Sequence, residues 1–436
     1  MKIKFLRKFF LLSFFSIFFL LEDIVAEKEI NLLDLYKSLH SHPELSFQEK
    51  QTSQKLALIL KNLGYKVTQE FGGYGVVAIL ENGKGKAVML RADMDGLPIE
   101  ERTGVSYASR KKSFNSEGQE VYTMHACGHD IHMTALIGTA QNLIKNKNKW
   151  KGTLILILQP AEEVSGGARA MLKNGLYSKF PRPDYNIALH VSADLEAGKV
   201  GYIPGYAMAN VDSVDILIKG IGGHGAYPHK TKDPIVLASQ LVMALQTIVS
   251  REISPLEPAV ITVGSFHAGT KHNIIPNEVK LQLTLRSYTD EVRQKTIDSI
   301  TRIAENLAQS SGLPQSLYPE IVIKDEYTPA VFNDPNLTNK LRASFESSLG
   351  EENVIRVLPV MAGEDFGMFG RTDPPVPTAL FWLGAVNQKD YKLVKEKNNT
   401  LPSLHSNRFL PDPITTINTG VKVSTKALYD LFNLED

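Results

Sequence analysis

The sequence predicts an α/β protein in which a mixed sheet carries helices on both faces and a smaller α+β domain is inserted. Short apolar runs bounded by turn residues alternate with segments of helical periodicity, which is typical of strands covered on both faces. From about residue 210 the elements follow the order βαββαβ, the ferredoxin-like arrangement. After Tyr327 the first pattern resumes, so the second domain is an insertion.

Four apolar runs are the expected central strands of the main sheet. They are Val76 to Leu80, Ala87 to Leu90, Thr153 to Leu158 and Asn186 to Leu189. The last three lead directly into polar segments that contain Asp93, the pair Glu162-Glu163, and His190. Ligands of open α/β sheets bind beyond the carboxyl ends of the strands. We therefore expect these four side chains to converge at one edge of the sheet.

The inserted domain is expected at residues 210–325, and residues 27–209 and 326–436 are expected to form the main domain. Asp233 is the expected cap of a helix in the insertion, with Pro234 at the first helical position. The other expected elements of the insertion are strands at Val211 to Lys219, Val260 to Phe266, Val279 to Arg286 and Ile321 to Ile323, and a helix from about Asp290 to Ser310.

The stretch "MHACGHDIHM", residues 124–133, holds the single cysteine of the chain among three histidines and an aspartate. Asp130 is expected to cap a helix, which places Cys127 and His129 in the turn at its N-terminus. A lone cysteine cannot form an intramolecular disulfide, and a structural zinc site usually needs several closely spaced ligands. A metal site completed from elsewhere, or a nucleophile, remains.

Composition and charge favour a small-molecule partner over nucleic acid. The 48 Lys and Arg residues nearly balance the 47 Asp and Glu residues, for a formal net charge of +1. The body of the chain has no basic run with interleaved aromatic residues. A content of 43% hydrophobic residues is ample for the cores of two or three domains.

Residues 1–26 have the features of an export signal. Four basic residues among the first eight precede an apolar run from Phe9 to Leu21. This run is shorter than the roughly 20 residues that span a membrane, which favours a cleaved signal peptide over an anchor. The protein is therefore expected to be exported, to a periplasm or to the medium, and not to associate with a membrane after signal removal.

Five side chains offer the nitrogen, oxygen and sulfur ligands that bind zinc, manganese or cobalt. They are Cys127, His129, Glu163, His190 and His405. Each alone has an ordinary explanation, such as a core histidine or a solvated glutamate. Five ligands, with a thiolate able to bridge, suit two metal ions better than one. Because Pro160 fixes a turn before Glu162 and Glu163, one carboxylate can bind metal while the other acts as a base.

Eight motifs in order resemble those of the di-metal aminoacylase and amidohydrolase family, in particular the branch with hippurate hydrolases and plant auxin-conjugate (IAA-amino acid) hydrolases. They are "RADMDGLPI", "HACGHDIHM", "QPAEE", "ALHV", "GIGGHGAYPH", "HNIIPN", "MAGEDFGMF" and "LHS". The resemblance extends over about residues 40–436. The resemblance implies an enzyme that hydrolyses the amide bond of N-acyl amino acids or similar small amides and peptides.

The resemblance also implies a site with two divalent ions, manganese or zinc, with cobalt or nickel as alternatives. Cys127 matches the bridging position, which is an aspartate in sister branches, and the other four side chains match the remaining ligands. Glu162 matches the general base, which takes a proton from an activated water and passes it to the leaving nitrogen. Asp93 matches a residue that holds a ligand in place, a role that Glu364 and Asp365 could share.

In the inserted domain, His224 matches a histidine that closes over the substrate and stabilises the oxyanion, in some relatives across a dimer interface. The insertion is accordingly expected to be a lid and to allow a homodimer. Strand alternation directs Arg286 away from the core of the insertion, so that Arg286 and the nearby Asn273 can bind a free carboxylate of the substrate. The polar stretch 387–400, which departs from the family pattern, is expected to form a loop near the site.

Two other functions are compatible with parts of the sequence. Cys127 could be the nucleophile of a cysteine amidase, since a helix N-terminus would lower the pKa of its thiol. The chain could also be a catalytically inactive small-molecule-binding protein of the same fold. The intact Glu162 and the full ligand set argue against inactivity, and the family position of Cys127 argues against the nucleophile.

Overall fold

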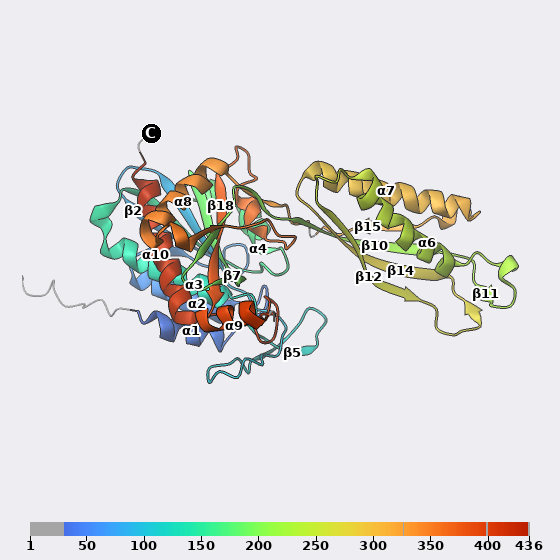
Figure 1. The fold of residues 1–436 in the computed structure, drawn as a ribbon, viewed down its shortest axis with the longest axis horizontal. Coiled ribbons are helices and arrows are strands. Elements are labelled where there is room, and N and C mark those ends of the chain that lie inside the picture. The colour runs from blue at the N-terminus through green and yellow to red at the C-terminus, as the bar shows by residue number, and fades with distance from the viewer. Residues whose placement is uncertain (1–29, 326, 398–399, 435–436) are drawn as a thin grey trace, which may run out of the picture.

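The computed structural model describes residues 30–325, 327–397 and 400–434, which form two bodies joined by extended segments (Figure 1). The larger body carries an eight-stranded mixed sheet and the smaller one a four-stranded sheet. The predicted fold class, a mixed α/β protein with a ferredoxin-like α+β unit, is confirmed. The expected export signal lies outside the described residues.

The main sheet has the strand order β1-β2-β6-β3-β7-β18-β8-β17. The bounds are β1 (Lys66–Thr68), β2 (Val76–Asn82), β6 (Gly152–Gln159), β3 (Ala87–Asp93), β7 (Tyr185–Glu196), β18 (Thr378–Val386), β8 (Val200–Tyr202) and β17 (Val354–Arg356). Strands β6, β3, β7 and β18 are parallel neighbours. Their carboxyl ends therefore lie side by side at one edge.

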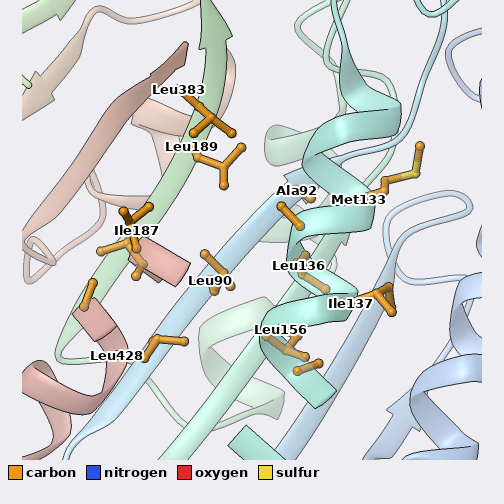
Figure 2. Close-up of a cluster of buried hydrophobic side chains, with 14 of the residues drawn as sticks. Leu90, Ala92, Met133, Leu136, Ile137, Leu156, Ile187, Leu189, Leu383 and Leu428 are labelled. Carbon is orange, nitrogen blue, oxygen red and sulfur yellow. The ribbon is translucent and has the colours of Figure 1, made fainter. Parts of the chain in front are cut away.

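Helices cover the two faces of this sheet. They are α1 (Leu32–His40), α2 (Lys50–Asn62), α3 (His129–Lys145), α4 (Gly167–Lys173), α5 (Leu176–Lys179), α8 (Pro335–Leu349), α9 (Gln388–Lys397) and α10 (Pro413–Phe432). On one face Leu90 and Leu156 pack against Leu136 of α3 and Leu428 of α10 (Figure 2). On the other face Met89 belongs to a second cluster that includes residues of α4 and α5. Alternation along each strand thus supplies both cores.

The N-terminus of α3 differs from the prediction. Asp130 does not cap the helix, because Gly128 is the N-cap residue, with φ 79°, and Asp130 lies in the first turn. A Cβ at Gly128 would lie 2.5 Å from Val191 Cγ2, so both the left-handed conformation and the close approach to β7 require glycine. Asp130 Oδ2 instead lies 2.7 Å from the Nδ1 atom of the buried His40.

The smaller body consists of β10 (Asn210–Lys219), α6 (Pro234–Thr247), β12 (Ala259–Ala268), β14 (Glu278–Ser287), α7 (Asp290–Ser310) and β15 (Glu320–Ile323). Its antiparallel sheet has the order β12-β14-β10-β15. The Asp233 cap is confirmed, because its side chain accepts hydrogen bonds from the N–H groups of Ile235 and Val236. The short strands β11 (Gly223–His224) and β13 (Ile274–Ile275) pair at the end remote from the larger body (Figure 1).

Helix α6 is embedded in the smaller body by one apolar face. The helical stretch 234–252, with a mean hydropathy of 1.3, is the one stretch of the described chain that is long and apolar enough to cross a membrane. Leu237, Leu241 and Leu245 of this stretch are buried in the core beneath the four-stranded sheet. Packing within the protein therefore accounts for much of its apolar character.

The polar stretch 387–400 was expected to form a loop, and this expectation was wrong. It contains helix α9. Lysine, glutamine and glutamate are good helix formers, and Asn387 Oδ1 accepts a hydrogen bond from the N–H of Lys389 at the start of the helix. High polarity alone therefore did not indicate a loop.

Polar contacts connect the two bodies beside the joining segments. Arg371 of the larger body forms an ion pair with Asp290 at the start of α7. The Tyr327 hydroxyl donates to the same carboxylate over 2.8 Å, and the Arg293 guanidinium lies 3.9 Å from the centroid of the Tyr327 ring. These exposed or half-exposed contacts join the start of α7 to the larger body and to Tyr327.

His40 ties the N-terminal helix to α3 and predicts a pH dependence of stability. Although burial opposes the charge, hydrogen bonds to Asp130 and Glu101 raise the pKa of His40 from 6.5 to about 9. Its contribution to the free energy of unfolding is therefore present in full below pH 6.5 and is lost as pH rises through 9. The pKa difference corresponds to roughly 3 kcal/mol.

We expect His40→Gln to be less stable than the wild type at pH 6.5, with the gap closing by pH 9.5. Denaturant unfolding of both proteins at several pH values, with the same metal content, measures this. A gap that stays constant across this window would contradict a charged His40.

Candidate metal centre

The ends of three adjacent parallel strands position the acidic and histidine side chains of the site. Asp93 is the last residue of β3 and lies opposite Gln159, the last residue of β6. Glu162 and Glu163 follow β6 after a short turn, and His190 lies within β7. The predicted convergence at one sheet edge is therefore observed.

Two of the groups of potential ligand atoms at this edge together contain the five side chains proposed from the sequence. One consists of Cys127, His129 and His190, the other of Cys127, Glu163 and His405, and in each group the atoms lie within 4.8 Å of one another. The five side chains proposed from the sequence are thus brought together, and Cys127 belongs to both groups. The His405 loop is held by a 2.9 Å hydrogen bond from its N–H to the carbonyl of Ala126.

The residues at this edge fit a pair of divalent cations. Both ring nitrogens of His129 and the Oε1 atom of Glu163 are buried without a hydrogen-bond partner among the described residues. Buried polar atoms of this kind are costly unless they are paired or coordinate a metal. Burial opposes charge on His129, yet Asp93, Asp95 and Glu163 raise its pKa to about 10. The surroundings therefore favour positive charge where a cation would sit.

Asp93 supports the histidines of the cluster. Its Oδ1 atom lies 2.6 Å from His132 Nδ1, and its Oδ2 atom accepts a 2.7 Å hydrogen bond from Arg91. His132 Nε2 accepts a hydrogen bond from the N–H of Val191, next to His190. Burial lowers the pKa of His132 to about 3, so this ring is neutral and acts as a polar spacer between the carboxylate and β7.

Asp95 is a site residue to which sequence reasoning assigned no role. Its two carboxylate oxygens accept the backbone N–H groups of Glu162 and Glu163 over 3.1 and 3.0 Å. Its Oδ1 atom also lies 3.4 Å from His129 Nδ1. Because side chains two residues apart in extended chain share one face, the position of Asp95 after Asp93 was a usable signal.

Arg91 is a second residue that the sequence did not single out. This arginine is 1% exposed and donates to both oxygens of Glu364, over 2.9 and 3.2 Å, as well as to Asp93. The carboxylates of Glu162, Glu364 and Asp365 gather within 4.8 Å of one another. Burial and these carboxylate neighbours raise the pKa of Glu162 well above its ordinary value. Glu162 therefore has a high affinity for a proton.

The thiol of Cys127 does not have the environment of a nucleophile. Burial raises its pKa well above 9, and Glu163, Glu162 and Asp93 raise it further. The expectation that the helix N-terminus would lower this pKa was therefore wrong, because burial and nearby negative charge dominate. The nearest histidine nitrogen, His190 Nε2, lies 3.5 Å from the sulfur.

The structure does not bring the residues of the insertion to the metal cluster. His224 lies on β11 at the remote end of the smaller body (Figure 1), and Asn273 is beside it, since the Asn273 carbonyl accepts the N–H of Gly225 over 2.9 Å. Arg286 lies near the other end of β14, where it donates to Thr284 and forms no salt bridge within the described chain. Its guanidinium forms no ion pair among the described residues, although the Asp212 carboxylate acts on its pKa and opposes the effect of burial.

Comparison with known proteins identifies the family. Residues 89–406 match the model of peptidase family M20/M25/M40, which is more than half of the chain. The chain belongs to this family. The M20 assignment confirms the resemblance seen in the sequence. Membership of this family shows that the protein is a hydrolase that acts on amide bonds. The residue clusters described above are compatible with the metal binding of this family.

Three M20 relatives illustrate the similarity. Thermostable carboxypeptidase 1 of Saccharolobus solfataricus is 35% identical over 396 residues, which cover 90% of this chain and 93% of the relative. Hippurate hydrolase of Campylobacter jejuni is 38% identical over 334 residues, which cover 76% and 82%. The crystal structure of the Bacillus subtilis YXEP protein, a dinuclear metal binding peptidase from the M20 family, superposes with a TM-score of 0.74 at 29% identity and covers 92% of this chain and 97% of that one.

Proposed function

We propose that this M20 hydrolase cleaves the amide bond of N-acyl amino acids, or of related small amides and peptides, that carry a free carboxylate. The observation that carries the proposal is the pair of ligand groups that share Cys127, with the proton-binding Glu162 beside them. One relative is named a hippurate hydrolase and another a carboxypeptidase, which supports an N-acyl amino acid or a peptide as the substrate.

We propose two divalent ions in this site, manganese or zinc, with cobalt or nickel as alternatives. The proposed ligands are Cys127 as the bridge, with His129, Glu163, His190 and His405. The mixed nitrogen, oxygen and sulfur set suits these metals better than magnesium or calcium. When bound, two such ions lower the pKa of a water molecule toward neutrality.

Glu162 is proposed to take the proton of that water and to deliver it to the leaving nitrogen. Asp95 holds the backbone of Glu162 through a hydrogen bond, which fixes the position of the base. Asp93 keeps His132 and the neighbouring ligands in place. Glu364 and Asp365, gathered around Arg91, surround the base with negative charge and so favour its protonation.

The smaller body, residues 210–325, is proposed to be a lid and a dimerisation domain over the metal-binding catalytic domain formed by residues 27–209 and 326–436. His224 is proposed to donate a hydrogen bond to the oxyanion, and Asn273 and Arg286 to bind the substrate carboxylate. Because β11 and the adjacent Asn273 lie far from the metal cluster within the chain (Figure 1), we propose that a second copy supplies both His224 and Asn273. Arg286, at the other end of β14, would come from the chain that holds the metal ligands. Exposed apolar side chains on α6, Val236 at 53% and Met243 at 72%, support such an interface.

The expected surroundings of the protein follow from the sequence. We propose export to a periplasm or to the medium, because residues 1–26 have the features of a signal peptide. The near-zero net charge supports a small-molecule substrate and no nucleic-acid partner. No membrane association is proposed after signal removal.

Substitution of the two adjacent glutamates tests the division of roles. Glu162→Gln should retain metal and lower kcat about a hundredfold or more, because a positioned base contributes about that much. Glu163→Gln should instead lower metal content. Elemental analysis and kcat on N-benzoyl and N-acetyl amino acids measure both effects. Normal turnover by Glu162→Gln would remove it as the base.

Substitution of Cys127 distinguishes a cysteine that bridges two metal ions from a cysteine that acts as a nucleophile. Cys127→Asp should bind metal and keep measurable activity, because a carboxylate can also bridge two ions. Cys127→Ala, the matched control, should bind less metal and lose more activity. Mass spectrometry of rapidly quenched wild type should show no acyl group on Cys127. An acyl adduct, together with an inactive Cys127→Asp, would contradict the proposed bridge.

Mixing two inactive variants tests whether His224 acts across a dimer. His224→Ala should keep its metal and lose about a hundredfold in kcat, the usual cost of one oxyanion donor. After unfolding and joint refolding with an equal amount of Glu162→Gln, about a quarter of wild-type activity should return, since half of the random dimers contain one competent site. No recovery in a mixture shown to contain heterodimers would place His224 in its own subunit's site.

A further inference from the structure

Two exposed apolar side chains border the loop that carries Glu162 and Glu163. Phe47 is 44% exposed, and Val164, which directly follows Glu163, is 50% exposed. Both approach Gly166, where an added Cβ would lie 2.9 Å from Phe47 Cζ and 3.6 Å from Val164 Cγ2. The phenyl ring and the isopropyl group therefore line the same small part of the surface beside the metal cluster.

Phe47 occupies this position at a conformational cost. Its φ is +60°, a region that bulky residues rarely adopt and that clusters at functional positions. The buried Glu49 carboxylate holds it there, because one oxygen, Oε1, accepts the N–H of Phe47 over 2.9 Å and the N–H of Ala161 over 2.7 Å. Ala161 immediately precedes Glu162, so a single acceptor joins Phe47 to the catalytic loop.

The Asp95 carboxylate also links the segment that contains Phe47 to the segment that contains Glu162 and Glu163. Asp95 Oδ2 accepts the Ser46 hydroxyl over 2.6 Å and the N–H of Glu163 over 3.0 Å. Residues 46–49 and 161–164 are thus held together on both sides of Phe47 by buried acceptors. The phenyl ring keeps a fixed position relative to the proposed base and the proposed ligand.

The space beneath the ring is formed by glycines. A Cβ at Gly73 would lie 3.1 Å from Phe47 Cδ1, and Gly166 leaves room on the neighbouring side. The inner edge of the ring is therefore packed, while much of the ring stays open to solvent. An apolar surface that is held rigidly and left open suits contact with an apolar group of a ligand.

The position of this surface indicates which part of a substrate it would meet. The side chains proposed for the substrate carboxylate, Asn273 and Arg286, lie on the smaller body, whereas Phe47 and Val164 lie on the larger body next to Glu163. An amide whose carbonyl lies at the metal cluster and whose carboxylate points to the lid leaves its acyl group on the side of the larger body.

We propose that Phe47 and Val164 form the wall of the acyl-group pocket, so that the enzyme prefers aromatic or medium-chain acyl groups to acetyl. This proposal rests on the proposed function and names its substrate class. Contact with an apolar wall distinguishes acyl groups by their size, and a few carbon atoms of difference are worth roughly tenfold or more in kcat/KM.

The test compares N-acetyl, N-benzoyl and N-octanoyl derivatives of one amino acid. Wild type should favour the two larger acyl groups, and Phe47→Gly should lower kcat/KM for them about tenfold while changing that for the acetyl substrate less than about twofold. Glycine tolerates the positive φ, so the melting temperature should not fall. Val164→Ser should act in the same direction. Leu58→Ala, on the exposed face of α2 and 58% exposed, is the control and should change nothing.

A binding measurement keeps the two proposals separate. The metal-loaded wild type should bind benzohydroxamate more tightly than acetohydroxamate in calorimetry, and Phe47→Gly should abolish most of the difference. If wild type hydrolyses none of the three substrates, the proposed function fails. The ratio of the affinities for the two hydroxamates still tests whether Phe47 contacts the acyl group. Equal affinities of wild type for benzohydroxamate and acetohydroxamate would contradict the proposed acyl-group pocket. An equal loss of both ligands in Phe47→Gly would also overturn it, because Phe47 would then only support the loop.

Discussion

The compensation of buried negative charge is the constraint on which the site depends. Carboxylates gather beyond the ends of β3 and β6, namely Asp93, Asp95, Glu162, Glu163, Glu364 and Asp365. Arg91 neutralises part of this charge from within, and His129 is driven toward its charged form by the remainder. Burial raises the pKa of Glu163 to about 8. Protons and divalent cations therefore compete for these side chains, which couples metal binding to pH.

Backbone strain in this protein is concentrated around the same cluster. Among the described residues, five non-glycine residues have a positive φ. Phe47, Ala161, Ser165 and His405 are four of them, and all lie in segments that border the metal cluster. Strain of this kind persists where surrounding contacts over-determine the conformation. For Phe47 and Ala161 the contacts are hydrogen bonds to the buried Glu49 carboxylate. Ser165 and His405 are held by the backbone carbonyls of Glu162 and Ala126.

The two bodies divide the chemistry between them. The proposed metal ligands and base lie on the strands of the larger sheet, on the loops beside them and at the start of α3. This framework is packed on both faces of the sheet. The proposed donor to the oxyanion lies on a short two-stranded sheet of the smaller body, remote from the main sheet (Figure 1). Such a division makes catalysis depend on an approach of two bodies, within one chain or between copies, and it leaves the cluster open to substrate beforehand.

The sequence by itself determined the order of the elements, the parallel strands, the ferredoxin-like unit and the set of candidate metal ligands. The elements follow from periodicity and from the positions of turn residues, which are local. The ligand set follows from the chemistry of the side chains and from the resemblance of the motifs to those of a known family. The helical stretch 388–397 was missed because polarity was taken as the sign of a loop, although its residues favour helix. The Asp130 cap was wrong because a close contact between Gly128 and Val191 decides where the helix begins.

Only the tertiary structure decided which polar groups meet. Arg91 and Glu364 are 273 residues apart in the chain, and no local sequence pattern predicts their contact. The same holds for the Glu49 carboxylate, which accepts the N–H of Ala161, 112 residues away, and for the environment that raises the pKa of Cys127. Spacing along the chain specifies which face of an element a side chain occupies. Its partner, its burial and therefore its charge depend on elements that only the folded sheet brings together.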